Sequence, residues 1–149
     1  MKLTTEEEKV QFILSVYFRT QAAIEKYMGV DGLPAWTAHV AEMNAESARN
    51  RYPERPDQAR ALLDGLSAML EVYGSDYVDD EKDGLKTLNV TRCGIYAYRE
   101  RARDQGVQLT LETPCEFCVD LRYRTAEHLG LEVSHELGVR SCSWATRTS

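Results

Sequence analysis

All four cysteines of this 149-residue chain lie after residue 92, at Cys93, Cys115, Cys118 and Cys142. An ionised cysteine can act as a nucleophile or a metal ligand, whereas a neutral one often packs as a small hydrophobic side chain. The first residues, MKLTTEEEKVQF, are interrupted by charges and do not resemble a secretion signal. We therefore expect a reducing, cytoplasmic setting, in which these cysteines are thiols or ligands rather than disulfides.

Cys115 and Cys118 form a CxxC motif in the segment TPCEFC, which also predicts the start of a helix. Thr113 suits the N-cap, Pro114 suits the first helical position, and Glu116 completes a capping box. Free amide groups and the helix dipole stabilise a thiolate at such a position and lower its pKa. The motif could be a redox pair, half of a metal site or two buried thiols. The redox interpretation lacks the βαβ context in which such pairs occur.

The four cysteines together could also bind zinc or an iron–sulfur centre, with His135 able to replace one of them. The spacing argues against a metal, because long and uneven gaps separate the CxxC pair from Cys93 and Cys142. A typical zinc site has two close pairs of ligands. A metal site formed by Cys93, Cys115, Cys118 and Cys142 is therefore kept as the alternative hypothesis.

Residues 131–147 predict a β-hairpin with Gly138 and Val139 as its two-residue turn. This register places His135 opposite Cys142, with Trp144 on the same inward face. A three-residue loop would move Cys142 to the other face. An inward histidine is either a hydrogen-bonded core residue or, beside a thiol, a base next to a nucleophile. Both interpretations are open at this point.

Three more candidates lie at the ends of predicted elements. Cys93 follows a predicted strand (85–92) and precedes a predicted helix (94–105), a corner that favours nucleophiles and phosphate-binding loops. Arg92 could neutralise a substrate carboxylate, although a buried thiol and a solvated guanidinium fit the sequence equally well. Asp120 falls within the first two turns of the helix that begins at Pro114, where it could orient a cationic group.

Residues 1–84 predict a helical scaffold of three helices. The first is capped by Thr5 and ends at Gly29, the second has Pro34 in its first turn, and the third is capped by Asp57 and ends at Gly74. The acidic segment 75–84 is predicted to be a solvated connection. The face expected to be buried in the second helix comprises Trp36, Val40 and Met43.

Residues 85–149 predict a cysteine-bearing α+β segment: a strand over 85–92, helices over 94–105 and 114–129, an extended segment over 107–111, and the hairpin. We predict one α+β domain over 1–149. Three N-terminal helices pack on a small, mostly antiparallel sheet with two further helices.

Charge and apolar patterning limit the partners of the chain. Its formal net charge of −6 disfavours nucleic acid as a partner, because binding to phosphates depends on Lys and Arg. Nowhere does the sequence contain the roughly 18 consecutive apolar residues that a membrane-spanning helix needs, so no membrane partner is expected. The broad apolar helix faces fit either the core of a monomer or a homo-oligomer.

Four segments, NVTRCGIYAY, CEFCVDL, HLGLEVSHEL and SCSW, resemble the L-2-amino-thiazoline-4-carboxylic acid hydrolase family over about residues 85–147. In that family an Arg-Cys corner precedes a helix, a Cys closely followed by an Asp begins a second helix, and a terminal strand carries a Cys before an aromatic residue. The chain departs from this pattern at Gly94, where the family has Pro, and at the additional Cys115. The matching positions are Arg92 with Cys93, Cys118 with Asp120, and Cys142 with Trp144.

The resemblance implies a small-molecule hydrolase that opens a cyclic amidine-like ring at a carbon–nitrogen bond, gives an N-carbamoyl cysteine, and needs no cofactor. It implies Cys93 or Cys118 as the thiolate, with Asp120 near the ring nitrogens. Arg92 would hold the substrate carboxylate, and His135 would transfer protons. The alternative is a non-catalytic cysteine-cluster domain that binds a metal or a small ligand as a sensor or interaction module. The residues expected at the hydrolase site are Cys93, Cys118, Asp120, His135 and Cys142, with Arg92 and Trp144 contacting the substrate.

Overall fold

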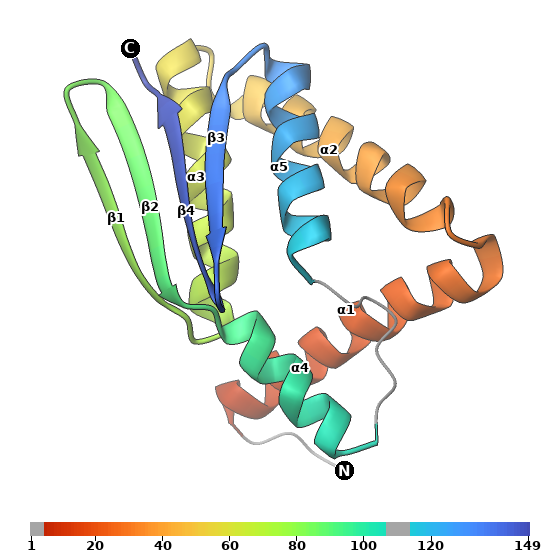
Figure 1. Cartoon of the computed structure of the whole chain (residues 1–149). Coiled ribbons are helices and arrows are strands. Elements are labelled where there is room, and N and C mark those ends of the chain that lie inside the picture. Colours follow the sequence, from red (N-terminus) through yellow and green to blue (C-terminus); the bar gives the residue numbers. More distant parts are fainter. Residues whose placement is uncertain (1–4, 107–113) are drawn as a thin grey trace.

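A computed structural model describes residues 5–106 and 114–149 and shows an α+β fold with three N-terminal helices and a four-stranded antiparallel sheet, as predicted (Figure 1). The N-terminal helices are α1 (Glu6–Met28), α2 (Gly32–Arg51) and α3 (Arg55–Val72). The first hairpin, β1 (Asp76–Lys82) and β2 (Leu85–Arg92), leads into α4 (Gly94–Asp104). Helix α5 (Pro114–Leu129) and the hairpin of β3 (Val133–Gly138) and β4 (Ser141–Arg147) complete the chain.

The sheet has the strand order β1-β2-β4-β3, so the two hairpins meet where β2 pairs with β4. Helix α3 lies along one face of this sheet, and α5 packs between α2 and the edge strand β3 (Figure 1). Helix α4 leaves the lower end of β2 and packs against α1 (Figure 1). No helix in the described part of the chain is both long and apolar enough to cross a bilayer.

Two hydrophobic cores meet at Met69 and Cys93, which pack against both. Alternation along β2 and β4 turns one set of side chains toward α3, so these strands bury one face. The core between the sheet and α3 comprises Leu63, Leu66, Leu70, Leu88, Val90 and Trp144. The core between α1, α4 and the end of α3 comprises Leu14, Phe18, Tyr73, Ile95, Tyr98 and Ala102.

The helix ends confirm most of the local predictions. The capping box of Thr5 and Glu8 is present, and Gly29 ends α1 with a φ of 76°. The predicted Asp57 cap of the third helix is wrong, because the N-cap is Glu54, three residues earlier. Pro56 fits inside its first turn, where no backbone N–H is needed.

The predicted buried face of α2 is only partly right, because Trp36 and Val40 are half-buried and Trp36 stacks on Phe117 of α5. Met43 is 56% exposed, whereas Thr37, Ala41 and Ala45 are buried. Helix α5 packs closely on this helix, and small side chains permit that approach. Close packing rather than apolar size therefore decides which face is covered.

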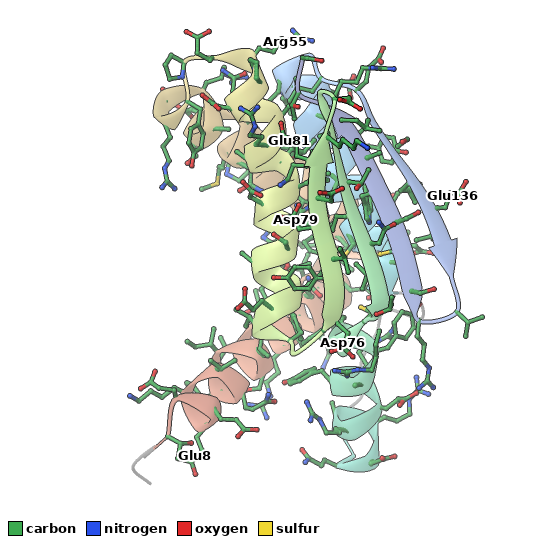
Figure 2. All side chains as sticks on the ribbon, turned by 90° about the vertical axis from the view of Figure 1, so that its left-hand side faces the viewer. Glu8, Arg55, Asp76, Asp79, Glu81 and Glu136 are labelled. Carbon is green, nitrogen blue, oxygen red and sulfur yellow. The ribbon has the colours of Figure 1, made fainter. Side chains whose placement is uncertain are left out.

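The acidic segment 75–84 is exposed as predicted, but it is not a plain connection, because Asp76–Lys82 form strand β1. Strand β1 pairs with β2 through a turn at Asp83 and Gly84, whose φ values of 52° and 72° are those that an Asp-Gly hairpin turn favours. Figure 2 shows Asp76, Asp79 and Glu81 spaced along this edge strand. Charged side chains on an edge strand oppose pairing with a further chain.

The C-terminal hairpin forms, but the predicted register is wrong. Its turn is Val139 and Arg140, the latter with a φ of 54°, so Leu137 lies opposite Cys142 and His135 opposite Trp144. The backbone N–H of Cys93 donates to the Arg140 carbonyl oxygen at 2.9 Å, a tertiary contact that local turn propensities do not reveal. Because the register moves by two residues, His135, Cys142 and Trp144 still share one face of the sheet. The predicted Thr113 cap and the predicted extended segment 107–111 lie outside the described residues.

Candidate functional site

The four thiols are carried by the start of α4, the first turns of α5 and strand β4. All four are free and half-buried. Their ionisation is coupled: negative charge on Cys93, Cys115 or Cys142 would raise the pKa of the Cys118 thiol. The three stretches that carry the thiols therefore lie close enough to interact electrostatically.

Burial raises the pKa of three of these thiols. For Cys93, backbone N–H groups at the start of α4 oppose the effect of burial only in part. For Cys142, the indole of Trp144 does the same. Cys118 has the largest increase, to a pKa of about 12, although the positive charge of Arg122 acts against it. All three are therefore neutral thiols at pH 7.

Cys115 differs from the others because a phenol contacts its sulfur. The Tyr96 hydroxyl lies 3.2 Å from Cys115 Sγ. This hydrogen bond is the main reason why the pKa of Tyr96 is raised to about 12. The hydroxyl therefore keeps its proton at neutral pH and can donate it in a hydrogen bond to the sulfur. Cys115 also lies in the first turn of α5.

The charged residues predicted to act with the thiols are bonded to other groups. Arg92, whose side chain is 54% exposed, donates to an Asp76 carboxylate oxygen at 2.7 Å and to the Gly74 carbonyl oxygen at 2.6 Å. Asp120 accepts from Arg124 Nε at 2.7 Å, one turn along the same helix. Neither side chain is directed to a thiol by these bonds.

His135 forms an aromatic group with Tyr123 and Trp144. Its Nδ1 lies 2.8 Å from the Tyr123 hydroxyl, and its ring stacks on Trp144 with centroids 4.9 Å apart. The predicted pairing of His135 with Cys142 does not occur, because Leu137 occupies that place in the ladder. His135 is therefore held between strand β3 and helix α5 by its contacts with Tyr123 and Trp144.

Arg122 was missed by the sequence reasoning and lies at the centre of this region. It is only 5% exposed, and burial lowers the pKa of its guanidinium. It follows Cys118 by one helical turn and interacts with Cys118 and with Tyr17 of α1. An arginine on the apolar stripe of α5 was the available signal, since Leu121, Thr125 and Ala126 are buried on the same helix.

A cavity of about 10 Å³ lies beside Cys118, between α1 and the ends of α3 and α4. Its volume is about that of one water molecule by this measure. Aromatic and aliphatic side chains surround it, and Gln21 is its polar member. The lining residues include Tyr17, Gln21, Met69, Tyr73, Phe117 and Cys118.

The metal hypothesis finds no ligand set. Within residues 5–106 and 114–149, no three His, Cys, Asp or Glu side chains converge as a metal ion requires. The thiols are therefore close enough to affect one another's pKa values, but they are not arranged as the ligands of a tetrahedral metal site.

Comparison with known proteins does not assign this chain to a family. No family model matches it, and no curated protein matches it significantly. The resemblance to the thiazoline hydrolases stays a prediction from short motifs.

Proposed function

We propose that this chain is a thiol-dependent hydrolase of small cyclic amidines, with Cys115 as its nucleophile. The observation that carries the proposal is the hydrogen bond between Tyr96 and Cys115, at a helix start next to three other thiols. The substrate class comes from the resemblance of residues 85–147 to the thiazoline hydrolase family. The choice of nucleophile comes from the surroundings of each thiol.

Cys115 is favoured because a nucleophilic cysteine must be ionised. Burial opposes ionisation of Cys93, Cys118 and Cys142. At Cys115 the Tyr96 hydroxyl lies 3.2 Å from the sulfur, so a hydrogen-bond donor is already in place for a thiolate formed on substrate binding. This choice departs from the resemblance, which implies Cys93 or Cys118.

The proposed reaction consumes one water molecule. In 2-amino-thiazoline-4-carboxylate, the Cys115 thiolate adds to the C=N carbon, and the bond from that carbon to the ring sulfur breaks. The ring therefore opens at a carbon–sulfur bond and not at the carbon–nitrogen bond expected from the resemblance, because N-carbamoyl cysteine keeps the bond to the ring nitrogen. Water then adds to the same carbon, and the bond to Cys115 Sγ breaks. The oxygen of water becomes the urea oxygen, and its two hydrogens end on the former ring nitrogen and ring sulfur. The product is an N-carbamoyl cysteine, and Tyr96 keeps its proton throughout.

The roles of Arg92 and Asp120 require exchange of partners on substrate binding. Arg92 would release Asp76 to hold the substrate carboxylate, and Asp120 would release Arg124 to accept from the amidine nitrogens. Both present ion pairs are partly exposed, so the exchange costs little. Cys142 and Trp144 would then form an apolar wall of the site.

A second candidate is a non-catalytic domain that binds a small ligand as a sensor. The raised pKa values of three thiols favour it, because neutral thiols line a pocket without reacting. The metal-binding form of this candidate is not supported by the described residues.

The test is release of a new thiol from 2-amino-thiazoline-4-carboxylate, measured with a chromogenic disulfide after the protein has been removed by ultrafiltration. We expect turnover by the unmodified chain, none by Cys115→Ser, and about 10- to 100-fold less by Tyr96→Phe, since one hydrogen bond to a charged atom is lost. Tyr77→Phe, which removes a phenolic hydroxyl bonded to Glu71 away from the thiols, is the matched control for Tyr96→Phe and keeps its activity. Full turnover by Cys115→Ser would exclude this nucleophile, and no turnover by the unmodified chain would favour the binding domain.

A further inference from the structure

A groove of about 470 Å³ lies between α2, α3 and α5, separate from the hydrogen-bonded Tyr96–Cys115 pair. This volume is within the range of small-molecule sites in proteins. Its wall is mostly apolar along α3 and α5, apart from Asp64, Arg122 and Thr125, and mostly polar along α2. The apolar residues include Leu62, Met69, Leu121 and Leu129, and the polar ones include Asn44 and Ser47.

Arg122 forms part of the groove wall and is the buried charge of this region. It is 5% exposed, and its Nε has no hydrogen-bond partner among the described residues. The two groups that interact with it electrostatically, Cys118 and Tyr17, are both neutral at pH 7, because burial raises the pKa of each. A guanidinium buried without a counter-charge is costly, and an anion in the groove would supply one.

The other charges on the groove leave it cationic. Arg51 stands at the exposed side, with its guanidinium 5.7 Å from the centre of the Tyr52 ring. Asp64 is the acidic member of the wall, but its carboxylate is held by Lys86 Nζ at 3.0 Å. Two arginines therefore face the groove against one carboxylate that is already paired.

We propose that this groove binds a small organic acid, with the carboxylate on Arg122 and the hydrocarbon body against Leu62, Met69 and Leu121. A planar guanidinium matches a carboxylate with two parallel hydrogen bonds. Arg51 adds a second positive charge at the exposed side of the groove. The site is independent of the proposed thiol chemistry, since binding there requires no cysteine.

The experiment titrates the ¹⁵N-labelled full chain with benzoate and follows the arginine Nε–Hε signals by NMR. Benzamide is the uncharged match, and inorganic phosphate tests whether any anion suffices. We expect benzoate to shift the Arg122 Nε–Hε signal with saturation, and benzamide and phosphate to leave it unchanged. Equal shifts with benzoate and benzamide, or saturation by phosphate alone, would overturn the proposal.

Two variants and a control separate the groove from general effects. Arg122→Met should weaken benzoate binding by about 10- to 100-fold, the cost of losing a charge-assisted pair. Arg51→Gln, at an exposed position that does not threaten folding, should weaken it about threefold, as expected for a partly screened charge. Arg124→Met, two residues along the same helix and paired with Asp120, should leave it unchanged. If Arg51→Gln and Arg122→Met both bind benzoate as tightly as the unmodified chain, this groove is not the binding site, whatever the result of the hydrolase assay.

Discussion

Gly94 is the residue at which a single methyl group should do the most damage. A Cβ built on Gly94 would lie 2.0 Å from the carbonyl oxygen of Tyr73 and 2.7 Å from its carbonyl carbon. These are backbone atoms, and the Tyr73 ring is fixed between Phe18 and Tyr98 in the core. The Gly94 N–H also donates to Ser75 Oγ at 2.8 Å, so both sides of the contact are held. The methyl group therefore cannot be accommodated by rotating a side chain.

We expect Gly94→Ala to lower the free energy of unfolding by about 3 kcal/mol, the upper end of the usual range for overpacking, because backbone must move. For a chain of this length that corresponds to a fall in Tm of about 6–12 °C. Gly65→Ala is the matched control. It lies inside α3, and beyond the backbone of its own helix no atom comes within 4 Å of its added Cβ, so the substitution should raise the free energy of unfolding by about 0.5–1 kcal/mol.

Thermal and urea unfolding should show a lower free energy of unfolding for Gly94→Ala and a higher one for Gly65→Ala. Alkylation of Cys93 by iodoacetamide gives a local readout, because displacement of Gly94 loosens the corner that buries this thiol. A Gly94→Ala protein that melts within 2 °C of the unmodified chain, with unchanged alkylation of Cys93, would refute the packing argument. The hydrogen bond from Gly94 to Ser75 also accounts for a departure from the thiazoline hydrolase pattern, because a proline at position 94 would have no N–H to donate.

Arg122→Met should raise the free energy of unfolding, measured in urea, by about 1–4 kcal/mol, because it removes a buried charge that has no counter-charge. The control Arg124→Met should change it by less than about 1 kcal/mol. A destabilised Arg122→Met protein would contradict this account. Cys118 has a pKa of about 12 when folded and about 8.5 when unfolded, so its contribution to stability is complete below pH 8.5 and is lost toward pH 12. Cys118→Ala should therefore flatten the alkaline side of the stability profile, and an unchanged slope would count against it. Arg60 and Thr148 lower the pKa of Glu81 to about 2, so its contribution is present above about pH 4.3 and is lost as the pH falls toward 2. Glu81→Gln should remove that part of the acid dependence, as measured by urea unfolding from pH 2 to 6, whereas an identical acid profile would show that the pair with Arg60 does not stabilise the fold.

Elements with strong local signals could be predicted from the sequence. The capping box at Thr5, the strand composition of 85–92 and the glycine after Leu129 are set by neighbouring residues, and the corresponding elements form. Strand β1 was missed because its carboxylates suggest solvent. Their partners, Lys86 and Arg60, come from other elements.

The candidate site was less predictable. Residue types determine which chemistry is possible, but the packing of segments far apart in the sequence determines the geometry. The thiols could be picked out as candidates, but the burial that raises the pKa of Cys118 depends on α1 and α3. The hairpin turn at Val139 and Arg140 is joined to the start of α4 by the hydrogen bond from the Cys93 N–H to the Arg140 carbonyl oxygen, a contact between segments far apart in the sequence. The apolar stripe of α5 marks the position of Arg122 as unusual for an arginine, but its burial at the groove wall follows only from the packing of α2 and α3 on α5.

Helix α5 connects the thiols to the groove through two residues one turn apart. Cys118 lines the small cavity, Arg122 lines the groove, and Met69 of α3 lies on both. The charge of Arg122 is the main group that favours a Cys118 thiolate. A carboxylate bound to Arg122 would neutralise that charge and raise the pKa of Cys118 further. By linkage, ionisation of Cys118 would weaken carboxylate binding by the same factor, so the two anions compete for one buried cation.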